Sequence, residues 1–202
     1  MSLIAPLSEL EAVNRMLSSI GQSPVNTVDV SGLGDVSSAL NILRDISRDV
    51  QTLGWSWNTD ENYVLSPASD GTISLPGGYL LVEPMDPRLS IQARFKDGQA
   101  LLWDAANLTW QFALPVPVRI VWATQFEELP QAVRTYIATK AARHFQAQLI
   151  NSPTLDNYNL EDEQSSWLLL QRFERRQRQT NMFRRNPRLR RFYDRTDRWR
   201  RL

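Results

Sequence analysis

The sequence predicts an α+β protein: a four-helix domain with an inserted antiparallel β domain and an extended C-terminal tail. Three observations lead to this expectation. Apolar residues recur at helical spacing before residue 55 and again after residue 127. The stretch between alternates short aromatic and branched runs with Pro, Gly, Asp and Asn, as strands and turns do. The final stretch, 180–202, has little helical periodicity and interleaves arginine with aromatic residues.

Two helices are predicted in the first part of the chain. Ser8 and Glu11 form a capping-box pattern, in which each side chain satisfies a free backbone N–H at the helix start. Gly21 marks the end of this first helix. The second is expected from about residue 35 to 53, with Gly54 at its end. Both patterns are amphipathic, so both helices need partners to cover their apolar faces.

The middle of the chain predicts short strands at residues 90–95, 99–104, 110–114 and 118–122. The first two form a hairpin that turns on Asp97-Gly98, and a Pro-Val-Pro corner separates the last two. Five tryptophans in this region are Trp55, Trp57, Trp103, Trp110 and Trp122. We expect them to fill a small β core, because alternate strand positions point inward. A carbohydrate-binding platform is the alternative.

Helical periodicity returns after Pro130 and predicts a third helix to about Ile150 and a fourth over about 160–178. Acidic residues come first and basic residues last in this part, as the helix dipole favours. The expected division is a helical domain formed by residues 1–54 and 127–179, a β domain over 55–126, and a docking tail over 180–202.

Charge is distributed unevenly along the 202 residues, although the net charge is only +1. From Arg172 to the end there are 13 Arg against three acidic residues, so the preceding part carries −9. Such asymmetry is typical of a basic tail that has a partner. Arginine forms bidentate bonds and stacks on rings, which suits a protein or phosphate interface.

Composition excludes several classes of site. With no cysteine, the chain has neither disulfides nor thiolate metal ligands. Phosphate-binding loops and metal-ligand spacings are absent from the sequence, so we expect no cofactor and no metal. The N-terminal stretch lacks the pattern of a secretory signal, and no run approaches the ~20 apolar residues of a membrane span. We therefore expect a protein that is not exported by a signal peptide and does not enter a membrane.

Several strings resemble the tail tubular protein A family of short-tailed bacteriophages. LSELEAVNRMLSSIGQSPVNTV is similar to the family's opening helix and turn, and LGWSWNTDENYVL to its "GW.FN" crossing into the sheet. Residues 73–79 and the hairpin ending in LLWD fall where the family has strands. LPQAVRTYIATKAARHFQAQL resembles the helix that returns the chain to the helical domain, and EDEQ precedes the next helix. The resemblance covers about residues 8 to 176.

The resemblance implies a structural virion protein, not an enzyme. It implies a head-tail connector, an adaptor ring of twelve copies with the portal protein above and the tail nozzle (tubular protein B type) below. Viral DNA would pass through the ring during ejection, and the protein would be assembled in the host cytoplasm. The C-terminal segment would grip the portal through Phe183, Arg184, Arg185, Arg188, Arg190, Arg191, Phe192, Tyr193 and Trp199. Arginine and aromatic residues are the types that dominate interface hot spots.

Two other functions remain open from the sequence. A polysaccharide-hydrolysing tail protein would need two acids converging on a groove, and the candidate runs are Glu127-Glu128 and 161–163. Both precede helices, where acids serve as caps, and His144 lies on a helical pattern with apolar neighbours. A nucleic-acid-binding protein could use the tail's arginines on phosphates and its aromatic rings on bases.

Overall fold

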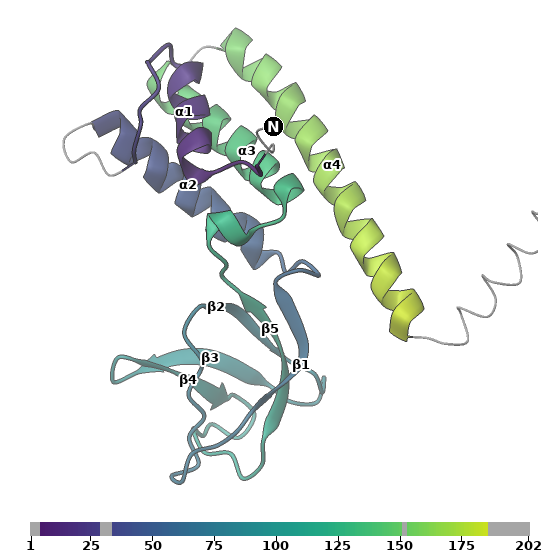
Figure 1. The fold of residues 1–202 in the computed structure, drawn as a ribbon. Helices are drawn as coiled ribbons and strands as arrows, with labels where there is room; N and C mark the ends of the chain where they lie inside the picture. Colours follow the sequence, from purple (N-terminus) through teal and green to yellow (C-terminus); the bar gives the residue numbers. More distant parts are fainter. Residues whose placement is uncertain (1–4, 29–33, 151–152, 186–202) are drawn as a thin grey trace, which may run out of the picture.

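The computed structural model describes residues 5–28, 34–150 and 153–185, and it confirms the α+β class. In this part of the chain four helices and a short 3-10 helix form a helix bundle, and five strands form a β lobe inserted between α2 and η1 (Figure 1). The helices are α1 (Glu9–Ser19), α2 (Gly34–Thr52), η1 (Phe126–Glu128), α3 (Gln131–Leu149) and α4 (Pro153–Arg185). The strands are β1 (Thr59–Leu65), β2 (Tyr79–Pro84), β3 (Ile91–Lys96), β4 (Gln99–Asp104) and β5 (Val116–Trp122).

Helix α3 lies in the middle of the bundle: α4 packs on it, and α3 in turn packs on α1 and α2 (Figure 1). Its buried stripe repeats every four residues, at Val133, Ile137, Ala141 and Phe145. Helices from both ends of the sequence share one core, which includes Met16, Leu43, Ile137, Phe145 and Leu170. Neither α1 and α2 nor α3 and α4 could bury their apolar faces alone. The core of the bundle is therefore complete only when the chain comes back from the β lobe and adds α3 and α4.

The predicted ends of the first helices are confirmed. The Ser8 hydroxyl accepts from the Glu11 amide at 3.2 Å, while the Ser8 amide donates to the Glu11 carboxylate at 2.9 Å. Gly21 follows α1 with a φ of 78°, and Gly54 follows α2 with a φ of 72°. Both glycines adopt the left-handed conformation that commonly ends a helix.

The β lobe combines a three-stranded antiparallel sheet, in the order β1-β5-β2, with the β3-β4 hairpin. The predicted hairpin is confirmed: Asp97 and Gly98 have φ values of 51° and 78°, the signature of a type I′ turn. The core of the lobe is aliphatic and separate from that of the bundle. Its fully buried members include Leu102, Val118 and Ile120.

Two of the strand predictions need correction. Residues 110–114 do not form a strand; the segment makes an isolated bridge from Gln111 to Thr72 and a bond from the Phe112 amide to the Gly71 carbonyl, but no continuous ladder. Its aromatic residues gave it a β pattern without a partner strand to pair with. The last strand begins at Val116, so Pro117 lies inside β5 rather than in a corner. Strands β1 and β2, which lie on either side of β5, were missing from the composition-based prediction.

The expectation that the tryptophans fill a β core is wrong for most of them. Trp55 is buried in the bundle core, and Trp57 packs against the same core. Trp103 and Trp110 pack edge to face with each other, with ring centroids 4.7 Å apart. Trp122 alone of the five packs against the β core. The buried members of the lobe's core are aliphatic.

The fourth helix is longer than predicted at both ends. It starts at Pro153, which lies outside the helix predicted from the sequence. Proline is compatible with this position because its missing N–H is not needed in the first turn of a helix. It continues to Arg185, so the first residues of the predicted tail are helical.

Candidate assembly surfaces

The chain leaves the bundle for the β lobe between α2 and β1 (the outgoing crossing) and comes back between β5 and η1 (the returning crossing). Two buried amide side chains join these two crossings. Gln51, at the end of α2, donates to the Thr124 carbonyl at 3.0 Å and accepts from the Thr124 amide at 2.7 Å. Asn58, just before β1, donates to the carbonyls of Gln51 and Trp122 at 3.0 and 2.9 Å. Each amide therefore bonds the outgoing crossing to the returning one, which sets the lobe's position relative to the bundle.

Gly54 lies at the outgoing crossing, directly under the side chain of Arg119. A Cβ at this position would lie 2.7 Å from Arg119 Nη2 and 3.2 Å from Val121 Cγ2. Arg119 cannot move freely, because its Nη1 is paired with Glu83 at 2.6 Å. The glycine thus provides both the left-handed turn and the space for the ion pair.

We expect Gly54→Ala to lower the free energy of unfolding by about 2–3 kcal/mol, because it combines a strained φ with a steric contact. Gly98→Ala is the matched control, since Gly98 has a similar φ of 78° but a Cβ added there would meet no heavy atom within 4 Å. That variant should lose only about 1–2 kcal/mol. Urea unfolding followed by tryptophan fluorescence measures both, and equal losses would contradict the steric contribution.

Helix α4 is anchored to the bundle by an aromatic cluster and by a buried carboxylate. Trp167 packs edge-on against Trp55, with centroids 5.6 Å apart, and tilts against Tyr136 at 5.0 Å. Burial raises the pKa of the Tyr136 phenol, which therefore stays neutral. Further along, buried Glu174 accepts from the amide and hydroxyl of Ser56 at 3.0 and 2.9 Å. These contacts hold α4 against both α3 and the crossing into the β lobe.

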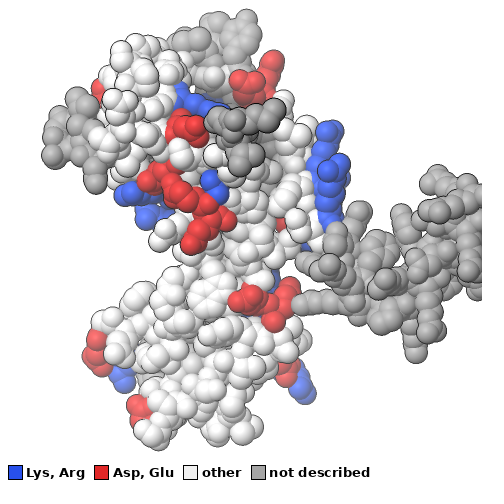
Figure 2. Space-filling view, in the orientation of Figure 1, with Lys and Arg blue, Asp and Glu red and all other residues white. Residues whose placement is uncertain are grey.

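The outer face of α4 is exposed and combines leucine with arginine. Leu168 and Leu169 are 52% and 55% exposed, and Arg172 and Arg175 follow on the same side of the helix. No ion-pair partner of either arginine is present among the described residues. Figure 2 shows basic side chains along the edge of the molecule that α4 forms. We refer to Leu168, Leu169, Arg172 and Arg175 as the α4 outer face.

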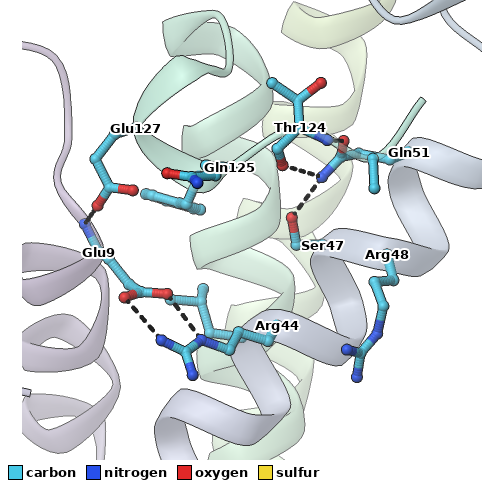
Figure 3. Close-up of a pocket in the computed structure, with 11 residues that line it drawn as sticks. Glu9, Arg44, Ser47, Arg48, Gln51, Thr124, Gln125 and Glu127 are labelled. Atoms are coloured by element: carbon cyan, nitrogen blue, oxygen red, sulfur yellow. Dashed lines mark hydrogen bonds and ion pairs between the residues drawn. The ribbon is translucent and has the colours of Figure 1, made fainter. Parts of the chain in front are cut away.

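The side of the bundle away from α4 carries acidic residues where α1 meets η1. Glu9, Glu11, Glu127 and Glu128 gather there, and we refer to them as the acidic corner. Figure 2 shows acidic side chains on this face. A groove of about 510 Å³ lies beside them, between α2 and the segment leading to η1 (Figure 3). The Glu9 and Glu127 carboxylates lie at its edge, with Arg44 and Arg48 along α2.

The acids at the groove hold the fold together. The Glu9 carboxylate binds Arg44 Nε at 3.1 Å, and the Glu127 carboxylate accepts from the Glu9 amide at 3.2 Å (Figure 3). Buried Arg134 adds three bonds, to the carbonyls of Leu7, Glu127 and Leu129. These contacts fix the start of α1 on the start of α3.

The other residues considered for catalysis are dispersed. Glu161 and Asp162 are exposed at the surface of α4, while Glu163 pairs with Arg143 at 3.0 Å. His144 is exposed on α3. Within the described ranges, no group of three or more His, Asp and Glu residues is placed to hold a metal ion. No helix in those ranges has the length and apolar character needed to cross a membrane.

Trp103 and Trp110 lie beside a hollow of about 440 Å³ on the β lobe. Cations occupy a face of each ring: the Arg94 guanidinium is 5.0 Å from the Trp103 centroid, and Lys96 Nζ is 5.5 Å from that of Trp110. Asp70 borders the hollow, and its bonds from the amide and hydroxyl of Thr72 lower the pKa of its carboxyl group. Asp70 is therefore ionised at neutral pH and is not suited to donate a proton.

The predicted portal-binding residues divide into two groups. Phe183, Arg184 and Arg185 belong to the last turns of α4, whose end extends past α3 (Figure 1). The other six lie outside the described residues: Arg188, Arg190, Arg191, Phe192, Tyr193 and Trp199. Sequence reasoning missed the buried polar residues Gln51, Arg134 and Glu174. Asn58 was within the string that resembles the family's crossing, but its spacing gave no indication of its bonds.

Comparison with known proteins supports the resemblance found in the sequence. Residues 10–180 match the sequence model of a family described as Tail tubular protein. The chain belongs to this family. A relative, Tail tubular protein A of Klebsiella phage KP34, is 28% identical over 173 residues, which cover 85% of this chain and 90% of the relative. This tail tubular protein is therefore a structural component of a phage tail.

The family match also shows which parts of this tail tubular protein are shared. It includes the helix bundle up to residue 180, the β lobe and both crossings between them. It ends five residues before α4 does and leaves residues 181–202 outside. All nine predicted portal-binding residues are in that last segment, so the family match does not include them.

Proposed function

We propose that this tail tubular protein forms an adaptor ring of twelve copies between the portal and the tail nozzle. In this proposal the bundle of residues 1–54 and 127–179 is the body of the ring, and the β domain of residues 55–126 grows from it. Residues 180–202 dock on the portal, and viral DNA passes through the ring during ejection. The work of the protein is then mechanical, carried by its interfaces.

The position of α4 is the observation that carries this proposal. The helix is fixed to the bundle as far as Glu174, and it then carries basic residues past the first turn of α3, which runs antiparallel to it (Figure 1). A rigid base of this kind lowers the entropy cost of docking the residues that follow. The arginines and aromatic residues beyond Thr180 have the chemistry to bind carboxylates and to fill apolar pockets.

We expect a chain that ends at Thr180 to lose binding to the cognate portal ring. The full chain should co-sediment with the portal. Truncation should lower the bound fraction about tenfold or more, because the same contacts are lost from every copy in the ring and the gain from multivalent binding is lost with them. The fold should survive, since every described anchor of α4 precedes the cut. Circular dichroism of the truncated chain checks this.

A second variant separates portal docking from attraction by charge alone. It retains every arginine and replaces four aromatic residues by alanine: Phe183, Phe192, Tyr193 and Trp199. Loss of co-sedimentation by this variant would support docking into portal pockets. If the full chain does not bind the portal but retards DNA, then the tail binds nucleic acid and the docking proposal is wrong.

A further inference from the structure

We propose that neighbouring copies in the ring associate head to tail, with the α4 outer face of one copy docked on the acidic corner and groove of the next. The inference rests on the proposed ring and names the two surfaces that build it. Three features carry it: the exposure of the α4 outer face, its opposite charge to the acidic corner, and the placement of the two surfaces on opposite sides of the bundle.

The α4 outer face has the composition of an interface rather than of a solvated helix surface. Leu168 and Leu169 are adjacent and more than half exposed, whereas Leu170, the next residue, is fully buried. Arg172 and Arg175 continue this face one and two turns further on. Adjacent exposed leucines bordered by arginines suit an acidic protein surface, and the leucines would gain nothing from a DNA phosphate backbone.

The acidic corner supplies the complementary charge. Glu128 is exposed, and no bond of its side chain is present among the described residues. The adjoining groove is lined by Leu43, Ala123 and Phe126 as well as by polar groups, so it can accept apolar side chains beside the acids. In Figure 3 the side chains of Glu127 and Gln125 lie on the same side of this groove.

The placement of the two surfaces decides the mode of association. Helix α4 lies on one side of α3, while α1 and α2, with the acidic corner, lie on the other (Figure 1). Two different surfaces that complement each other across one protomer produce heterologous contacts, which close into a ring or extend into a filament. Self-complementary dimers would instead require one surface to carry both charges.

Charge reversal in two separate chains tests this pairing. One chain carries Arg172→Glu and Arg175→Glu, and the other carries Gln125→Arg and Glu128→Arg, which leave the bond from the Glu9 amide to the Glu127 carboxylate in place. Either chain alone would place like charges opposite each other, and its incorporation into tail particles should fall about tenfold or more. Co-expressed, the two chains restore both contacts in alternation, so incorporation should return. If the mixture is no better than either chain alone, the pairing is wrong.

Cross-linking provides a measurement that does not depend on charge. Because the chain has no native cysteine, every disulfide between copies must involve an introduced residue. A chain with Leu168→Cys and Gln125→Cys should give a ladder of cross-linked species larger than dimers when tail particles are oxidised. Each single-cysteine chain can give dimers at most. Leu168→Cys with Phe95→Cys, on the exposed hairpin of the β lobe, is the matched control and should give no ladder.

Electron microscopy of the same particles separates the two proposals. Rings that form normally without a ladder from the Leu168→Cys/Gln125→Cys chain would overturn the head-to-tail pairing and leave the adaptor proposal intact. A native chain that forms no ring on the portal would overturn the adaptor proposal itself.

Discussion

Replacing Asn58 by alanine is expected to lower the free energy of unfolding by about 3–4 kcal/mol. The side chain is 3% exposed and makes three bonds. Its Nδ2 donates to the carbonyls of Gln51 and Trp122, and its Oδ1 accepts from the Trp55 amide at 2.9 Å. Alanine would remove all three bonds and leave the Trp55 amide buried without the Asn58 acceptor, which costs about 1–3 kcal/mol. The Gln51 carbonyl keeps its bond from the Gly54 amide at 3.1 Å, so losing the two carbonyl bonds costs less, about 0.5–1.5 kcal/mol each.

Urea unfolding followed by tryptophan fluorescence measures this loss, and Asn107→Ala is the matched control. Asn107 bonds to the Asp104 carboxylate at 2.7 Å, but it is exposed in a turn of the β lobe. Water can replace that bond, so the control should lose less than about 1 kcal/mol. Similar losses from the two variants would show that the crossings between bundle and lobe do not depend on Asn58.

The second large effect is expected from Leu170→Ala, which should lower the free energy of unfolding by about 2–5 kcal/mol. Leu170 is 0% exposed and is the most deeply buried of the α4 residues whose side chains the structure describes. Its truncation leaves a cavity between α4 and α3, where no other element can fill the space. Because the predicted portal-binding residues follow α4, the loosened helix should also weaken co-sedimentation with the portal.

Leu169→Ala is the matched control, because it removes the same atoms from the neighbouring position of the same helix. Leu169 is 55% exposed, so stability should change by less than about 0.5 kcal/mol. The proposed contact between copies predicts that Leu169→Ala nevertheless lowers incorporation into tail particles. A stability loss equal to that of Leu170→Ala would mean that α4 packs with a different face than the structure shows.

Prediction from the sequence succeeded where a structural signal is local. The capping box at Ser8 and Glu11, the Asp97-Gly98 turn and the glycine after α2 each depend on residues only a few positions apart. The α3 stripe was predicted for the same reason, because its apolar residues repeat along one helix face. Interactions of this range can be recognised without knowledge of the fold.

Prediction failed where a partner far along the chain was needed. Residues 110–114 have a strand-like composition but no paired strand, whereas β1 is mostly exposed and becomes a strand by pairing with β5. Helix α4 continues through Thr180 to Arg185 although the apolar periodicity stops earlier, so the absence of periodicity was a poor guide there. Secondary structure with weak local preference is decided by tertiary contacts.

The sequence by itself determined the α+β class, most helix limits, the charge asymmetry of the chain and, through its resemblance, the tail tubular family. Tertiary structure alone decided which polar residues join the bundle to the β lobe, because Gln51, Asn58 and Glu174 meet partners from distant segments. It also decided that the α4 outer face and the acidic corner lie on opposite sides of α3. Burial and relative position in space are properties of the packed chain, and no local pattern encodes them.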